Sequence, residues 1–183
     1  MARTNTKAPS TEPVAEDRLI DTESIEASAP QKPIVAKDID PSQYVIVRNG
    51  FQGKLTYKSS RTGESFKWSE FGAPQEMELR ELRNAKNTYK KFFINNWFMF
   101  DEEWIIDYLG VRQYYKNAIS IDDFDEIFKQ TPVSIKKTVA GLSDGQKKSL
   151  AYRAKALIAD GEIDSRKTIA ALEEALGVEL IEK

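Results

Sequence analysis

The sequence predicts an α+β fold: a small antiparallel β-meander or SH3-like barrel packed by an aromatic helix, followed by a helical C-terminal unit. Three observations support this. Eighteen of the 19 aromatic residues lie between Tyr44 and Phe128, whereas residues 1–40 contain no aromatic residue, no glycine and four of the seven prolines. Side chains alternate between apolar and polar in the stretch 44–68, and helix-capping residues punctuate the chain after residue 101. The composition therefore predicts an extended or disordered N-terminal arm over 1–40 and a folded part from 41 to about 180.

Three short strands are predicted between Tyr44 and Trp68. Residues 44–48 are β-branched or aromatic, residues 54–58 alternate, and Phe66 and Trp68 alternate with polar neighbours. Glycine-containing turns at 49–53 and 61–64 separate them, so we expect consecutive strands to pair as a meander, with 50–53 as a hairpin loop. A brief fourth strand is expected at Gln75–Leu79.

An amphipathic helix is predicted from about Glu78 to Phe93, because apolar and aromatic residues recur there at helical spacing. It is the expected cover for the apolar face of the meander. The following segment, Ile94–Phe100, is strongly hydrophobic and is expected to be buried and extended.

Capping residues predict the helices of the C-terminal third. Thr131-Pro132, Ser143 with Gln146, and Asp164 or Ser165 mark helix starts, and glycines follow the predicted ends. Asp101 and Ser120 with Asp123 are expected to cap two shorter helices. The predicted domains are the arm (1–40), the meander with aromatic helices (41–130) and the helical unit (131–183). The expected helical core is Leu150, Ala154, Leu157, Ile158, Ile169, Leu172, Leu176 and Leu180.

The composition excludes several chemistries. The chain has no cysteine and no histidine, which rules out disulfides, thiol nucleophiles, imidazole metal ligands and histidine general bases. The net charge of −2 is not that of a typical nucleic-acid binder. With no signal-peptide core and no apolar run of about 20 residues, we expect a protein of the cytoplasm without membrane contact.

Two carboxylate clusters, Asp101-Glu102-Glu103 and Asp122-Asp123-Asp125-Glu126, have residue types that bind Mg²⁺ or act as an acid/base pair. Both fall in the first turn of a predicted helix, where negative charge complements the helix dipole. The glycines at 50 and 53 lie between strands and not before a helix, so they do not form a phosphate loop. We expect no catalytic residue, no metal and no cofactor.

Basic residues concentrate on the predicted meander. They are Arg48, Lys54, Lys58, Arg61 and Lys67. One interpretation is that they form, with Tyr57 and Trp68, a face for single-stranded nucleic acid. The alternative is that the lysines occupy the solvent face and the rings the core face. A helix-turn-helix reader using Lys147, Lys148, Arg153 and Lys155 is a further alternative, opposed by the acidic residues nearby.

The arm contains five sizeable apolar residues in three small clusters. They are Leu19, Ile20, Ile25, Ile34 and Val35. These clusters are too small to form a core, but they are suited to docking on a neighbouring subunit, for instance as an added strand. We therefore expect them to bind a partner.

The order V-x-N-G-x-x-G-x-L-x-Y-x-S-x-R-T-G from Val47 to Gly63, then W-x-x-F-G, resembles small uncharacterised structural proteins of tailed bacteriophages. The stretch from Asp164 to Ile169 adds to the resemblance, which covers about residues 42–180. It implies a virion structural or assembly protein and provides no site residues.

We therefore predict a non-enzymatic virion subunit of the head, neck or tail. It would bind other virion subunits or copies of itself partly through its arm, and would be assembled in the host cytoplasm. The alternative, ranked second, is a nucleic-acid-binding accessory or regulatory protein that uses the basic face of the meander.

Overall fold

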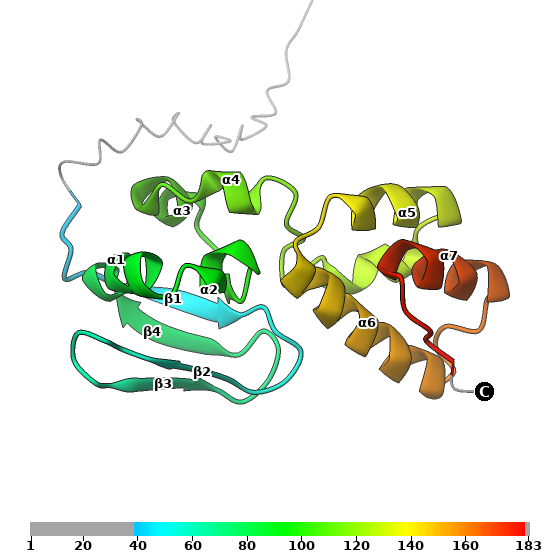
Figure 1. Cartoon of the computed structure of the whole chain (residues 1–183), viewed down its shortest axis with the longest axis horizontal. Helices are drawn as coiled ribbons and strands as arrows, with labels where there is room; N and C mark the ends of the chain where they lie inside the picture. The colour runs from blue at the N-terminus through cyan, green and yellow to red at the C-terminus, as the bar shows by residue number, and fades with distance from the viewer. Residues whose placement is uncertain (1–38, 182–183) are drawn as a thin grey trace, which may run out of the picture. The chain divides into compact units, whose positions relative to one another are not determined.

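The computed structural model describes residues 39–181, which belong to one compact unit (Figure 1). The predicted arm lies outside the described residues, except for residues 39 and 40. The fold is mixed α+β, as expected. The strands are β1 (Tyr44–Asn49), β2 (Leu55–Lys58), β3 (Ser65–Trp68), β4 (Pro74–Glu78) and β5 (Phe98–Met99). The helices are α1 (Leu79–Thr88), α2 (Lys91–Ile94), α3 (Glu103–Leu109), α4 (Arg112–Tyr115), the 3-10 helix η1 (Phe124–Lys129), α5 (Pro132–Ala140), α6 (Asp144–Ala159) and α7 (Arg166–Leu176).

The predicted meander is confirmed where β2 pairs with β3, but the predicted pairing of β1 with β2 is wrong. β1 lies at the centre of a three-stranded antiparallel sheet, between β4 and β5, while β2 and β3 form a separate two-stranded sheet. Val47 is opposite Gln75, and Leu55 is opposite Trp68. No described strand pairs across the two sheets, so an SH3-like barrel is not confirmed.

The loop after β1 explains why β1 and β2 do not form a hairpin. The Gly50 amide donates to the carbonyl oxygen of Trp97 at 2.8 Å. The buried Asn49 side chain donates to the carbonyl oxygens of Gly53 and Glu70, at 2.7 and 2.8 Å. A methyl group at Gly50 would clash with the carbonyl oxygen of Asn96. The loop is therefore held against distant segments instead of closing a tight turn.

One hydrophobic core joins both sheets to the helices that follow them. α1 packs on β4 and buries Leu79, Leu82 and Ala85, as predicted for the covering helix (Figure 1). The helix predicted to continue to Phe93 breaks at Tyr89, whose φ of −133° and ψ of 55° leave the helical region. Because of this break, α2 is a separate turn that buries Phe92 and Phe93.

Most of the capping predictions are confirmed. The side chains of Thr131, Ser143 and Ser165 accept hydrogen bonds from backbone amides at the starts of α5, α6 and α7. Gly110 and Gly177 end α3 and α7 with positive φ, the conformation that glycine adopts most easily.

Three details of this part differ from expectation. Asp101 does not cap α3, since its carboxylate instead accepts hydrogen bonds from Arg48. The segment after Ser120 forms a 3-10 helix in which the Asp123 side chain caps no backbone amide and instead accepts a hydrogen bond from the Ser120 hydroxyl. The short helix α4 had not been predicted. The Gln146 side chain bonds the backbone of Ile119 and not that of Ser143, so the capping box is only half formed.

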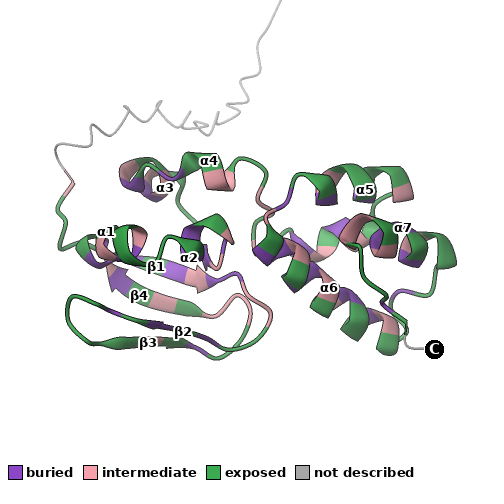
Figure 2. Ribbon diagram, in the orientation of Figure 1, coloured by how far each residue is buried: buried purple, intermediate pink, exposed green. Residues whose placement is uncertain are grey.

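A second core lies between η1, α5, α6 and α7. Its buried members include Leu150, Ala154, Leu172 and Leu180 from the predicted set, while Leu157 and Ile169 form a smaller adjoining cluster. Phe71, from the loop after β3, packs against Phe124 with ring centres 4.7 Å apart and the ring planes tilted by 51°. Figure 2 shows buried residues alternating along β1 and mostly exposed residues on the outer side of α5. Between residues 39 and 181, none of the helices is long and apolar enough to cross a bilayer.

Candidate protein-binding groove

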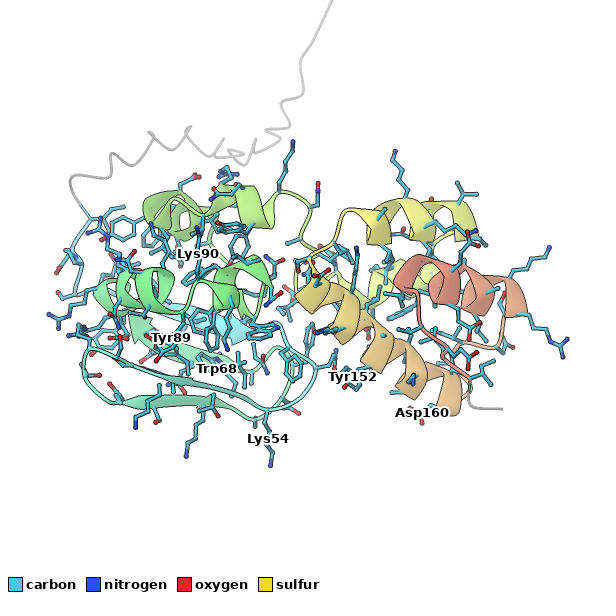
Figure 3. All side chains as sticks on the ribbon, in the orientation of Figure 1. Lys54, Trp68, Tyr89, Lys90, Tyr152 and Asp160 are labelled. Atoms are coloured by element: carbon cyan, nitrogen blue, oxygen red, sulfur yellow. The ribbon has the colours of Figure 1, made fainter. Side chains whose placement is uncertain are left out.

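A groove beside α6 combines exposed apolar side chains with lysines. Its lining residues, here called the α6 groove, are Asp144, Lys147, Lys148, Ala151, Tyr152, Lys155, Leu176 and Val178. The larger of its two hollows has a volume of about 360 Å³. Tyr152 is 62% exposed and Val178 is 43% exposed. Figure 3 labels Tyr152 on α6 and Asp160 at the end of the same helix.

The sequence of α6 produces two different faces. Leu150, Ala154 and Leu157 recur at spacings of four and three residues and are buried in the helical cores. Lys148 and Lys155 are two turns apart on another face, and the spacing places Tyr152 between them. The groove thus runs along the side of α6 that the core does not use.

The chain reversal after α7 completes the groove. Gly177 has a φ of 68°, in the left-handed region, and turns the chain back at the end of the helix. Leu180 is buried in the helical core, and its amide donates to a carboxylate oxygen of Glu173 at 2.9 Å. These contacts fix the segment that carries Val178, which lines the groove together with Ala151.

The groove is electropositive on balance. Lys147, Lys148 and Lys155 line it, and no carboxylate among residues 39–181 lies within ion-pair distance of them. Asp144 is its only acidic lining residue in this part of the chain. Arg153, on the same helix, is held at 2.6 Å from Asp125 and does not belong to the groove.

The basic face predicted on the meander is divided in the structure. Lys54, Lys58 and Lys67 are exposed, and the strand register places Lys58 and Lys67 on one outer face, opposite Ser65 and Thr56. Figure 3 shows Lys54 pointing away from the sheet. Arg48 and Arg61 do not join them, because each is held by carboxylates.

The carboxylate partners of the two arginines lie on other elements. Arg48 is 2.8 Å from Asp101, and Arg61 is 3.0 Å from Glu81 and 3.6 Å from Glu78. The rings that might have stacked on bases are also on the opposite side of the hairpin. Tyr57 and Trp68 are 1% and 2% exposed, within the core. The expected alternation of lysines outside and rings inside is confirmed.

A second basic cluster, on α1 and α2, had not been predicted. Arg83 lies over the ring of Tyr108, Lys90 over Tyr114 and Lys91 over Trp97, each within 6 Å of the ring centre. Lys86 donates to the carbonyl oxygen of Leu109 at 2.7 Å. None of these four cations forms an ion pair within the described chain. The net charge of residues 73–130 as a whole is negative, which concealed these four cations. The net charge of residues 80–91 alone is positive and would have revealed the cluster.

The carboxylate clusters are largely engaged by cations. Asp125 is paired with Arg153 and Glu126 with Lys129. Arg112 pairs with Asp107, and its hydrogen bond holds the pKa of Asp107 below the ordinary value. Asp101, Glu103 and Asp122 line one shallow hollow. No group of three or more acidic residues within residues 39–181 is arranged to hold a metal ion.

One acidic residue is fully buried. Glu81 is 2% exposed and accepts hydrogen bonds from Tyr57 at 2.7 Å, Arg61 at 3.0 Å and Asn84 at 3.1 Å. Burial alone would raise the pKa of Glu81, but the hydrogen bonds outweigh burial and lower it. Burial and the Glu81 contact raise the pKa of Tyr57. This network ties the β2–β3 hairpin to α1.

The five predicted arm residues, Leu19, Ile20, Ile25, Ile34 and Val35, lie outside the described residues, and their role stays a prediction. The comparisons with known proteins give no further guide. The chain matches no protein-family model, no curated protein and no solved structure.

Proposed function

We propose that the chain is a non-enzymatic structural or assembly subunit of a virus particle, in the head, neck or tail. It binds other virion subunits or copies of itself and is assembled in the host cytoplasm. The observation that carries this proposal is the α6 groove, where Tyr152 and Val178 are exposed among lysines that have no ion-pair partner within residues 39–181. Tyrosine joins a large apolar surface to a polar tip, and it is enriched at protein interfaces for that reason.

The arm is the second binding element in this proposal. Its apolar residues Leu19, Ile20, Ile25, Ile34 and Val35 would dock on a neighbouring subunit. Many weak contacts of this kind become strong in an assembly, because each bound arm raises the effective concentration of the next. In this proposal the groove of one subunit binds a neighbouring subunit, and the arm of the same subunit binds another.

The proposal is tested on purified particles of the virus that encodes the chain. Quantitative mass spectrometry should find the chain in a fixed ratio to the other particle proteins. Particles of normal composition that lack the chain would overturn the proposal.

For the strand region, we keep the SH3-like barrel as a proposal. It is supported by five short strands whose inward side chains, including Val47, Leu55 and Phe98, share one core. A closed barrel needs backbone hydrogen bonds between the two sheets, which cross-strand contacts between amide protons in an NMR spectrum would test.

A second candidate function is nucleic-acid binding, and the basic cluster on α1 and α2 favours it. Lys90 and Lys91 lie over aromatic rings and have no carboxylate partner in the described chain. Cations beside rings are typical of surfaces that bind single strands. In this reading, affinity for single-stranded DNA falls steeply as salt rises.

Two double variants distinguish the cluster from the hairpin face. Lys90→Glu with Lys91→Glu should weaken DNA binding at least about tenfold if α1 and α2 form the site. Lys58→Glu with Lys67→Glu should do so instead if the hairpin forms it, as the sequence suggested. Fluorescence anisotropy with labelled DNA measures both, and no binding at low ionic strength would exclude the second candidate.

A further inference from the structure

We infer that the α6 groove binds the acidic segment of residues 16–26 from a second copy of the chain. This inference rests on the proposed function, because it names the surface that receives a neighbour's arm. Residues 16–26 lie outside the described part of the chain.

The charges of segment and groove are complementary. Residues 16–26 contain five acidic residues and one basic residue, giving a net charge of −4. The groove has three lysines without ion-pair partners among residues 39–181 and one aspartate. Opposite charges speed association and suppress other partners. No other stretch of the arm combines so many acidic residues with apolar ones.

The apolar groups also match. Leu19 and Ile20 are adjacent, and Ile25 follows five positions later; each has an acidic residue within two positions. The groove has exposed apolar surface at Tyr152 and Val178, with lysines around it. An apolar side chain of the segment can therefore contact the ring while neighbouring carboxylates reach Lys148 or Lys155.

The occupant is a second copy for a geometric and a chemical reason. The segment and the groove are different parts of one chain, so their contact between copies is heterologous and can continue from copy to copy. An assembly needs contacts of this kind between its subunits. Within an assembly the local concentration of subunits is high, which favours weak binding between them. The expected product is a concentration-dependent series of oligomers, and salt should weaken it because the charges are exposed.

The test uses the full chain and sedimentation velocity at increasing protein concentration and low ionic strength. The wild type should self-associate. The groove variant Lys148→Glu with Lys155→Glu, and the arm variant Asp21→Lys with Glu23→Lys, should each associate at least about tenfold more weakly. The matched control is Lys137→Glu with Lys167→Glu, which makes the same charge change at exposed lysines outside the groove. It should behave like the wild type.

The decisive measurement mixes the two variants. In the mixture, the unaltered arm of the groove variant can bind the unaltered groove of the arm variant, so association should be stronger than for either variant alone. Tyr152→Ala should weaken association without changing the circular dichroism spectrum, since its ring is mostly exposed.

Several results would overturn the inference. They are a wild type that stays monomeric, a groove variant that associates normally, and a mixture that does not recover. A failure of this kind is distinct from failure of the proposed function, which depends on whether particles contain the chain.

Discussion

The Ser149 hydroxyl donates a hydrogen bond of 3.0 Å to the carbonyl oxygen of Gly50, 99 positions earlier in the chain. The Ser149 hydroxyl oxygen in turn accepts a hydrogen bond of 3.2 Å from the Gln52 amide. Ser149 is fully buried on α6, and Gly50 follows β1. This one side chain therefore links the helical core to the strand core.

Replacing Ser149 with alanine should destabilise the protein by about 1–3 kcal/mol, because the buried Gly50 carbonyl and the partly buried Gln52 amide lose their partner. Urea unfolding followed by tryptophan fluorescence measures the change. Ser69→Ala is the control, since Ser69 is exposed and makes no hydrogen bond through its side chain in the described structure. An unchanged midpoint for Ser149→Ala would contradict this role.

Gly145 gives a second test of the same contact region. A methyl group there would clash with the backbone carbonyl of Asn95, in the segment between α2 and β5. Glycine to alanine within a helix ordinarily stabilises by about 1 kcal/mol. Here we expect the opposite sign, a loss of about 1–3 kcal/mol, because backbone atoms cannot move aside as a side chain can.

The matched control for Gly145→Ala is Gly141→Ala. Gly141 has a φ of −86°, and the nearest atom to an added methyl group is the Asn117 side-chain nitrogen at 3.3 Å. That side chain can shift by the few tenths of an ångström required. The midpoint of thermal unfolding should therefore be clearly lower for Gly145→Ala than for Gly141→Ala. Equal midpoints would show that α6 is not in tight contact with Asn95.

Local signals predicted much of the helical unit. Thr131, Ser143 and Ser165 cap helices as expected, because a cap is a contact between residues three positions apart. The strand positions were predicted for a similar reason, since alternation shows which residues face inward. Val47 and Tyr57 are buried, as the alternation indicates.

The hairpin of β2 and β3 was predicted from its turn, but the partners of β1 could not be predicted in this way. Alternation gives the face of a strand but not its neighbour, and β1 pairs with β4 and β5 from later in the chain. Likewise, no local rule shows that Arg48 meets Asp101, 53 positions away, or that Arg61 meets Glu81. The predicted basic face depended on these arginines being free, and distant contacts removed both from it.

The α6 groove lay outside sequence reasoning for another reason. Its lysines were recognised, but only as a possible nucleic-acid reader. Val178 becomes part of the surface through the reversal at Gly177 and the burial of Leu180. A surface made by two segments requires the tertiary structure.

Glu81 makes stability depend on pH. The pKa of Glu81 is lowered in the folded state, so its contribution is present above the unfolded pKa of about 4.3 and is lost as pH falls through the lower folded value. Glu81→Gln should cost about 1–3 kcal/mol near neutral pH. The difference from wild type should shrink as the pH falls below about 4. Chemical unfolding at both pH values checks this.

Glu76→Gln is the control for the pH series, since Glu76 is exposed on β4 and has no side-chain partner in the described structure. A difference between wild type and Glu81→Gln that stayed constant down to low pH would contradict the assignment. It would mean that the hydrogen bonds to Glu81 contribute the same free energy to folding whether its carboxyl group is charged or neutral.

The arm provides the last prediction. Ile34 and Val35 are adjacent apolar residues just before the described part of the chain, and we propose that they bind a neighbouring subunit. Burying one such side chain contributes at most about 1.5–3 kcal/mol. Replacing both with glutamate should therefore reduce incorporation into particles at least about tenfold. The urea midpoint should not change, because the cores are built from residues 45 to 180.

Lys32→Glu with Lys37→Glu is a control that leaves the apolar pair intact. Normal incorporation of the Ile34/Val35 variant would remove this pair from the assembly contact, and normal incorporation of a chain lacking residues 1–40 would remove the whole arm from it.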